Sequence, residues 1–411
     1  YQTINIELQI QIIMGKRTII PIGPYHPLQE EPELFKLYCD GEIVKDIKWE
    51  TGYNHRGIEK LSESKTFDQV FFLVERVCGI CSASHPFAFA NCLEEIANVE
   101  VPNRAKYIRS IIGELERIHS HLLWLGLAGH FLGYNTVFMW AWKYREPILD
   151  LFEMITGNRN SYAMFKLGGV RRDIPNQLIP EIQKHMDNFI PKLDLLTGAV
   201  MDDPVIHART KGVGVLTKQD SIDFAAVGPT ARASGVDIDV RRDDPYAAYP
   251  LVNWKVITAE AGDVFSKTEV RLLEMYEAVS IIKQCLEGLK KEKEGETEVK
   301  VKNVPAGMGT GRAEAPRGEV FHFMITDGGY SPVRHKIRAP SYVNIATFKK
   351  SCVGQTISDA TITLAAVDPC YCCTERMAVA YDYYDHKPIL SGRDLIKRSQ
   401  QKTEDIRRSL R

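Results

Sequence analysis

Apolar and polar positions do not keep one period along the chain. Near its start, apolar residues alternate with polar ones in segments 18–22, 34–38 and 42–49. The last two segments flank Asp40-Gly41, a dipeptide typical of hairpin turns. The first part of the chain is therefore predicted to form a small antiparallel sheet.

From about Phe67 onward, the apolar positions recur every three or four residues. This helical period is clear in segments 108–122, 147–156, 179–196 and 264–289. Long amphipathic helices with few strands between them are typical of a helical bundle rather than of alternating strands and helices. We therefore expect a mainly α fold with small antiparallel β elements.

One apolar stretch, residues 118–142, carries no Asp, Glu, Lys or Arg and is long enough to cross a bilayer as a helix. Polar residues and glycines interrupt it, namely His119, His121, His130, Asn135, Gly126, Gly129 and Gly133. The helical pattern that leads into it begins in charged sequence. We therefore expect buried core here, and no transmembrane segment in the chain.

The mixed-charge run 290–298 is expected to be a solvated loop between two regions. After it, segments 299–304 and 319–325 are expected to be short strands on either side of a glycine-rich stretch, 306–312. That stretch lacks the Lys-Ser/Thr of a phosphate-binding loop, so its glycines indicate a close approach of another backbone. The chain is expected to become helical again near 344–353.

These patterns predict four regions. We expect a β region in 1–66, a helical core in 67–290, a β and loop region in 291–376, and a C-terminal tail in 377–411. Residues 1–13 have no signal-peptide features, and they are an upstream extension if translation begins at Met14.

Composition narrows the function. The 411 residues carry a formal net charge of -1, so there is no basic excess of the kind that binds nucleic acid. The nine cysteines are an odd number in a large chain without a recognisable secretory signal. Free thiols or metal ligands are therefore expected instead of a disulfide framework.

Four of the cysteines form two pairs at opposite ends of the chain. Cys78 and Cys81 lie in ERVCGICSASH (75–85), and Cys370 and Cys373 lie in DPCYCCTER (368–376). Four convergent thiolates suit zinc, an iron-sulfur centre or nickel, and a structural zinc is the simplest interpretation of the spacing alone. The wide separation of the pairs and the ionisable groups beside them favour a catalytic metal.

At this point the chain resembles a known family, the large subunits of nickel-iron hydrogenases. Within them it is similar to the energy-converting, membrane-bound group 4 type, which is homologous to the 49-kDa quinone-site subunit of respiratory complex I. The resemblance covers residues 22–396 and rests on both cysteine motifs together with GPYHP (23–27), EEP (30–32), GYNHRGIE (52–59), GELERIHSH (113–121), GGVRRD (168–173), GPTAR (228–232) and EAPRG (314–318). It implies the helical bundle of that family.

The resemblance also implies a nickel-iron centre with CO and cyanide ligands on the iron. Cys78 and Cys370 would bind nickel terminally, and Cys81 and Cys373 would bridge nickel to iron. No iron-sulfur cluster is implied in this chain. Cys372 departs from the family pattern as a third thiol in the last motif, and we interpret it as a bystander.

Around these ligands, the resemblance assigns roles to other residues. Cys370 is the expected first proton acceptor, and Glu31, on the loop within 1–66, would pass the proton outward. Arg317 would hang over the open coordination position and donate hydrogen bonds to the cyanide ligands. Asp368 would orient Arg317, and Pro316 would shape the turn.

Two further residues are singled out by position. His85, four residues after Cys81, is placed to hydrogen-bond a bridging sulfur. Many family members are cut after the residue that matches Arg376, which would remove the tail 377–411; some energy-converting members are not processed. The tail itself contains ILSGRDLIK (389–397), a pattern typical of a strand that leads into a capped helix.

The implied function is the interconversion of protons and electrons with H2. Electrons would come from ferredoxin through a small subunit with an iron-sulfur cluster. Other hydrophilic subunits and membrane subunits that translocate ions would complete the complex, which places this chain peripherally on the cytoplasmic face of the cell membrane. The alternatives are a complex I-like or sulfane or polysulfide reductase subunit, with His26 near a quinone, and a scaffold with structural zinc.

Overall fold

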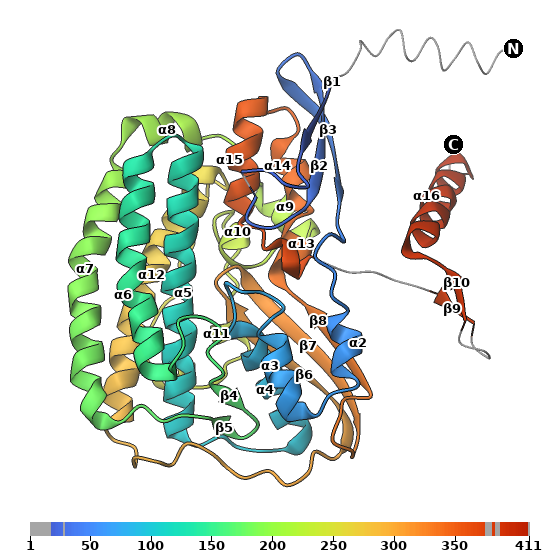
Figure 1. Ribbon diagram of the computed structural model, residues 1–411. Helices are drawn as coiled ribbons and strands as arrows, with labels where there is room; N and C mark the ends of the chain where they lie inside the picture. Colours follow the sequence, from blue (N-terminus) through green and yellow to red (C-terminus); the bar gives the residue numbers. More distant parts are fainter. Residues whose placement is uncertain (1–17, 28, 375–379, 383–386, 410–411) are drawn as a thin grey trace, which may run out of the picture.

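The structure is a computed structural model that describes residues 18–27, 29–374, 380–382 and 387–409. Met14 and the expected extension 1–13 lie outside the described residues, as does Arg376 with its expected cleavage position. Within the described ranges the fold is mainly helical, with small antiparallel sheets beside the helices (Figure 1), as the sequence predicts.

The N-terminal sheet forms as predicted. Strands β1 (Thr18–Ile22), β2 (Leu34–Asp40) and β3 (Ile43–Glu50) pair antiparallel in the order β1-β2-β3, with the hairpin turn at Asp40-Gly41. One face of the sheet is apolar and packs against α14 (Thr347–Cys352) and α15 (Ile357–Val367). The start of the chain is thereby attached to the segment that leads into the last cysteine motif.

The helical bundle occupies the left of Figure 1. Its long members are α5 (Asn103–Phe131), α6 (Asn135–Thr156), α7 (Ile179–Met201) and α12 (Val264–Leu289), and α5 packs against both α6 and α12. Helix α4 (Ser84–Ala97) lies beside the bundle and covers a sheet. Shorter elements are α2 (Ile58–Ser62), α3 (Phe67–Val74), α8 (Pro204–Thr210), α9 (Lys218–Asp223), α10 (Gly228–Arg232), α11 (Val240–Asp243), α13 (Pro340–Asn344), η1 (Asn176–Leu178), η2 (Tyr249–Leu251), η3 (Tyr371–Cys373), β4 (Phe165–Lys166) and β5 (Gly169–Val170).

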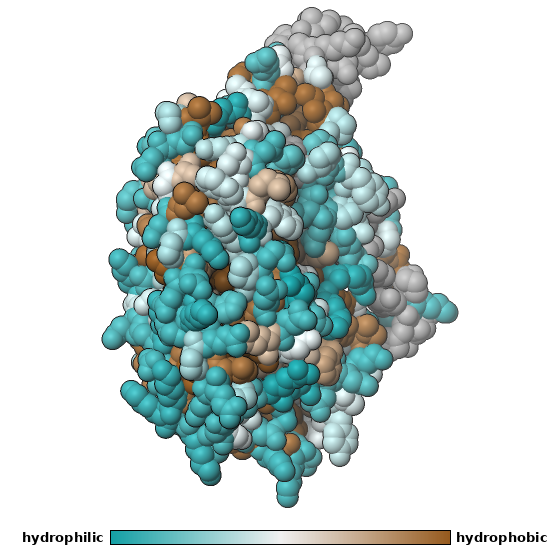
Figure 2. Space-filling model, turned by 60° about the vertical axis from the view of Figure 1, so that its left-hand side comes forward, coloured by the Kyte–Doolittle hydropathy of each residue, from teal (hydrophilic) through white to brown (hydrophobic). Residues whose placement is uncertain are grey.

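The charge-free stretch 118–142 is divided between two helices. Helix α5 ends at Phe131 and α6 begins at Asn135, with Gly133 between them at φ 80°. Among the described residues, no helix is both long and apolar enough for a membrane span. Figure 2 shows a face of the molecule on which hydrophilic residues predominate and hydrophobic ones are scattered.

The region after the mixed-charge run differs from the prediction in two respects. The glycine-rich stretch is itself a strand, β6 (Ala306–Ala315), which pairs with β7 (Gly318–Asp327), and β7 pairs with β8 (Arg334–Arg338). Segment 299–304 is not a strand, so that prediction is wrong. The chain there turns toward β5, where Val299 N donates to Gly168 O at 2.8 Å.

The glycines of β6 allow the close approach that the sequence indicates. At Gly311, a Cβ atom would lie 2.0 Å from Ala88 O on α4, which is far inside contact distance. Helix α4 therefore packs directly on the backbone of β6. This contact fixes α4, which begins just after the first cysteine pair.

The end of the chain forms a strand followed by a helix, as predicted. Strand β9 (Ala380–Tyr381) pairs with β10 (Pro388–Leu390), and α16 (Gly392–Ser409) follows, drawn apart from the bundle in Figure 1. Ser391 Oγ accepts from Asp394 N at 3.3 Å, and Asp394 Oδ2 accepts from Ser391 N at 3.0 Å. These two bonds form a capping box at the start of α16.

The contact of β6 with α4 yields a stability prediction. Gly311→Ala is expected to lower the free energy of unfolding by about 1–3 kcal/mol, because the new methyl group must displace backbone atoms. Gly307→Ala is the matched control on the same strand, since its Cβ would meet nothing closer than Ile96 Cγ2 at 3.5 Å. Chemical denaturation of both variants measures the difference; equal stabilities would contradict the close packing.

Candidate metal centre

The first cysteine pair lies on the turn between α3 and α4. Cys78 and Cys81 are both buried, and Cys81 N donates to Cys78 Sγ at 3.3 Å. His119 Nε2 holds the middle of the turn by a 3.1 Å hydrogen bond to Ile80 O. Glu116, also on α5, accepts from the backbone N–H groups of Ala83 at 2.5 Å and Ser84 at 3.1 Å. Helix α5 therefore fixes the position of both sulfurs.

The second pair follows the end of α15. Asp368 ends this helix in the left-handed region at φ 55°, and the chain then turns through η3. Cys370 N donates to Ser341 Oγ at 2.9 Å, and Cys373 N donates to Cys370 O at 3.0 Å. This tight turn places the two sulfurs near each other.

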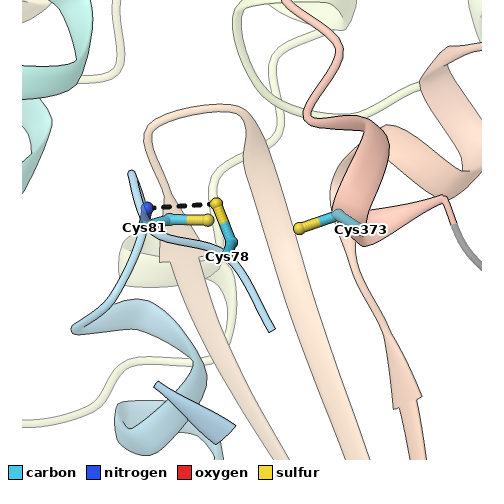
Figure 3. Close-up of side chains that lie close together, drawn as sticks. All are labelled: Cys78, Cys81 and Cys373. Carbon is cyan, nitrogen blue, oxygen red and sulfur yellow. Dashed lines mark hydrogen bonds between the residues drawn. The ribbon is translucent and has the colours of Figure 1, made fainter. Parts of the chain in front are cut away.

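The structure brings the two pairs together. Cys78 Sγ lies 3.1 Å from Cys370 Sγ, and the sulfurs of Cys78, Cys81 and Cys373 all lie within 4.8 Å of one another (Figure 3). All four thiols are free and buried. Two sulfurs that share one metal at bonds of about 2.3 Å can be at most about 4.6 Å apart. The 3.1 Å pair lies inside this limit and the 4.8 Å bound on the other three is close to it, so the cluster has about the dimensions of a metal site.

The thiols influence each other's ionisation. Burial by itself raises the pKa of Cys78, but hydrogen bonds from the other three thiols and the charge of Arg317 lower it well below its usual value. Hydrogen bonds to Cys373 and Cys78 raise the pKa of Cys370 well above its usual value. Without a cation, adjacent buried thiols resist simultaneous ionisation; metal binding favours the fully deprotonated set.

Arg317 lies in the turn between β6 and β7, directly after Pro316, and is buried. Its Nε donates to Asp368 O at 2.9 Å, and its Nη1 donates to Ser120 Oγ at 3.0 Å. Its Nη2 lies 2.7 Å from Asp368 Oδ1 as an ion pair, yet makes no hydrogen bond to any residue that the structure describes. A buried donor without an acceptor is costly, so the site suits a ligand that accepts a hydrogen bond.

Arg317 is held as a cation close to the thiols. Burial opposes its charge, but Asp368, Glu30, Cys370 and Cys78 outweigh burial and raise its pKa well above its usual value. The guanidinium therefore acts as a fixed positive charge beside the cluster.

Asp368 is itself supported by a residue that the sequence did not single out. Arg271, on α12, approaches Asp368 Oδ2 with its Nε at 3.8 Å and donates from Nη2 to Ala366 O at 3.0 Å. Its guanidinium lies 4.2 Å from the centre of the Trp124 ring. No motif marks Arg271, because its role depends on the packing of α12 against α5 and α15; Ser120, by contrast, lies within the recognised segment 113–121.

Glu31 reaches the cluster from the loop between β1 and β2. Cys370 Sγ donates to Glu31 Oε2 at 3.6 Å, and Cys372 N donates to the same oxygen at 2.5 Å. The Cys372 side chain is only partly buried, unlike the four clustered thiols. Its backbone N–H and its thiol both hydrogen-bond Glu31, and His26 lies partly exposed earlier on the Glu31 loop.

Segment 52–59 connects the Glu31 loop to the first cysteine turn by hydrogen bonds. Asn54 Nδ2 donates to Pro32 O at 2.9 Å, next to Glu31. Arg56 Nη2 donates to Val77 O at 2.9 Å, next to Cys78. The sequence identified this segment as part of the resemblance but assigned no role to these two residues.

His85 approaches the cluster from α4, with Nε2 3.8 Å from Cys373 Sγ. Burial lowers the pKa of His85 to about 4. Its Nδ1 lies 3.2 Å from Nε2 of His322, a residue on β7 that sequence reasoning missed. Alternation along β7 is a signal for a buried position at His322, but its partner could not be read from the sequence.

Known proteins are similar to this chain in sequence and in fold. The family described as the 49 Kd subunit of respiratory-chain NADH dehydrogenase matches residues 132–303 and 296–376, and the family described as nickel-dependent hydrogenase matches residues 56–128. The membrane-bound hydrogenase subunit alpha of Pyrococcus furiosus is 39% identical, over 94% of this chain and 93% of that protein.

Two further known proteins are similar to this chain. The carbon monoxide-induced hydrogenase of Rhodospirillum rubrum is 37% identical, over 87% of this chain and 99% of that protein. A solved chain of the archaeal membrane-bound sulfane sulfur reductase is 29% identical with a TM-score of 0.83, over 88% of this chain and 98% of that chain.

The metal content of two variants tests which cysteines of the last motif are metal ligands. Cys370→Ala is expected to lose most of the bound transition metal, because it removes one of the four clustered thiols. Cys372→Ala is the matched control and should retain the metal. Inductively coupled plasma mass spectrometry of the purified complexes measures the metal content of both variants. Metal loss only in Cys372→Ala would mean that Cys372, not Cys370, is the ligand.

Proposed function

Because the chain belongs to the family that unites nickel-dependent hydrogenases with the 49 Kd subunit of respiratory-chain NADH dehydrogenase, we propose that it is the catalytic subunit of a membrane-bound, energy-converting nickel-iron hydrogenase. The reaction is the interconversion of protons and electrons with H2. The observation that carries the proposal is the cluster of four buried, free thiols beside a buried arginine nitrogen without a hydrogen-bond acceptor.

These residues fit a nickel-iron group with CO and cyanide ligands. Cys78, Cys81, Cys370 and Cys373 would hold the two metals. Soft thiolates suit such metals, and Arg317 Nη2 is a donor that a cyanide nitrogen can accept from. When bound, the group would supply the open coordination position and the redox-active metals for H2 chemistry.

The protein's own residues supply the proton path. Cys370 Sγ and Glu31 Oε2 are within hydrogen-bonding distance, so a proton on the thiol can pass to the carboxylate. Glu31 is half-buried and can hand the proton toward the surface. Arg317, held by Asp368 and Ser120, keeps a fixed charge over the sulfurs and needs no reorientation during the reaction.

The remaining machinery lies in partner chains. Electrons would come from ferredoxin through a small subunit that carries an iron-sulfur cluster, since we assign no such cluster to this chain. Further hydrophilic subunits and membrane subunits would couple the reaction to ion translocation. The relative named a membrane-bound hydrogenase subunit supports a membrane-bound complex. Within this proposal, the chain lies peripherally on the cytoplasmic face.

A second candidate is reduction of sulfane sulfur or polysulfide at the same thiol cluster. The structural likeness to a sulfane sulfur reductase favours it. A complex I-like quinone reaction or a structural zinc would leave the unmatched donor of Arg317 and the thiol contact of Glu31 without a task.

Infrared spectroscopy of the nickel-replete, fully assembled complex tests the proposal. The expected result is a set of CO and cyanide stretching bands together with H2/D2 exchange activity, because both require the nickel-iron group. Bands with polysulfide reduction but no H2/D2 exchange would favour the second candidate. Absence of the bands would contradict both the cofactor and the proposed function.

Glu31→Gln tests the proton path. The amide oxygen of glutamine can still accept from Cys372 N, but the side chain cannot carry a proton, so H2 turnover is expected to fall about 10²- to 10⁴-fold. The CO and cyanide bands should stay unchanged. Glu42→Gln, on the exposed hairpin, is the control with normal turnover; full turnover in Glu31→Gln would remove Glu31 from the path.

A further inference from the structure

A second line of hydrogen bonds leads away from the cluster through Cys373. His85 Nε2 lies 3.8 Å from Cys373 Sγ, and His85 Nδ1 lies 3.2 Å from His322 Nε2. His322 Nδ1 lies 3.0 Å from His335 Nε2, and His335 Nδ1 lies 3.0 Å from Ser62 Oγ. Each step is within hydrogen-bonding distance. The path is therefore continuous from the metal centre to the end of α2.

The path is built by long-range packing of separate elements. His85 comes from α4, while His322 and His335 come from the neighbouring strands β7 and β8. His322 pairs with Ile337 and His335 pairs with Met324, so the two histidines are diagonal neighbours within reach of each other's rings. All three imidazoles are fully buried. Three neighbouring histidines in an apolar core are costly unless every ring nitrogen has a partner.

Ser62 sets the direction of the hydrogens along this path. Its hydroxyl donates to Glu59 O at 2.7 Å, so its oxygen accepts from His335 Nδ1–H at the other side. His335 Nε2 then has no hydrogen and accepts from His322 Nδ1–H, and the same arrangement repeats at His85. The lone pair of His85 Nε2 consequently faces Cys373 Sγ.

The outer end of the path meets acidic groups at the surface. Glu59 and Glu63 have side chains that are 25% and 12% exposed, and they pair with Lys336 and Arg334. Burial lowers the pKa of His335 to about 4, although both carboxylates act in the opposite direction. The rings are thus neutral at rest, which suits proton transfer by exchange of tautomers without a charge held in the interior.

We propose that His322, His335 and Ser62 form a second proton route of the metal centre, which begins at His85 and reaches the surface at the end of α2. This route rests on the hydrogenase function proposed above. It is separate from the route through Glu31, because the two begin at different thiols.

Protons balance along the route and no electrons move through it. One proton arrives at His85 Nε2, and each ring passes its Nδ1 proton to the next acceptor. The Ser62 hydroxyl finally turns away from Glu59 O and releases its proton, and the acceptor is the carboxylate of Glu59 or Glu63, the two acidic groups whose charges act on His335. The reverse sequence carries one proton inward, so the same chain serves H2 oxidation and H2 production.

Ser62→Ala tests the route in the assembled complex, in the parent protein and in the Glu31→Gln background. The proton-transfer rates of two parallel routes add. Ser62→Ala alone, which leaves the Glu31 route intact, should therefore lower H2 turnover less than about threefold. In the Glu31→Gln background it should lower the remaining turnover about tenfold or more. Ser64→Ala, two residues along, is the matched control, because Ser64 Oγ is exposed and bonds only to Leu61 O at 2.8 Å. It should change neither rate.

His322→Gln provides a second variant inside the path. Glutamine offers a donor and an acceptor but does not exchange protons as an imidazole does. His322→Gln, like Ser62→Ala, is therefore expected to lower H2 turnover much more in the Glu31→Gln background than in the parent protein. The CO and cyanide bands should be unchanged in both variants. If a variant lowers H2 turnover by the same factor in the parent and in the Glu31→Gln background, the relay is overturned. Loss of the CO and cyanide bands in both variants also overturns the relay, because it would mean that these residues only support the structure of the metal centre.

A spectroscopic readout is independent of turnover. Solid-state ¹⁵N spectra of the histidine-labelled complex should show Nδ1–H tautomers for His322 and His335, and Ser62→Ala should change both signals. Tautomers that do not respond to Ser62→Ala overturn the relay. A parent complex without H2 turnover overturns the proposed function instead, so the two failures are distinguishable.

Discussion

The ion pair between Arg317 and Asp368 is the interaction on which the metal centre depends. It joins the β6–β7 turn to the residue that ends α15, and Ser120 adds a contact from α5. Both partners are almost completely buried, so the removal of one would leave an uncompensated charge at a cost of about 3–5 kcal/mol. Asp368 occupies the left-handed backbone region and immediately precedes the last cysteine motif. One interaction thus holds the arginine close to the cluster and anchors the residue that precedes the second cysteine pair.

Helix α5 provides the frame for this interaction. Its segment 113–121 buries side chains that would be exposed on most helices, and each has a definite partner. Glu116 and His119 hold the first cysteine turn, whereas Glu114 and Arg117 pair with each other at 3.0 Å and connect to α12 and β6 through further buried ions. Such pairs are weak evidence for stability, since desolvation offsets most of the attraction. Their effect here is positional: they link the bundle to the strand that leads to Arg317.

The sequence was informative where the structure depends on local rules. The hairpin at Asp40-Gly41 and the long helices follow from turn chemistry and apolar period, and the capped entry to α16 follows from Ser391 and Asp394. The glycine-rich segment was misjudged because its glycines serve a neighbour, α4, and leave its strand conformation intact. Within the site, the residues that belong to motifs could be named in advance. Arg271, His322 and His335 could not, because their partners lie far away in sequence and no pattern encodes that meeting.

The polar side chains on the two sides of the thiol cluster differ, because one side is half-buried and the other is fully buried. Near Cys370, the loop carries a carboxylate, Glu31, which is half-buried and accepts a hydrogen bond from the backbone N–H of Cys372. Near Cys373, the surroundings are fully buried, and a carboxylate there would have to be protonated or paired. Neutral imidazoles avoid this cost, since each ring is both donor and acceptor and no step requires a resting charge. A route through the interior is therefore made of histidines, and a route close to the surface uses a carboxylate.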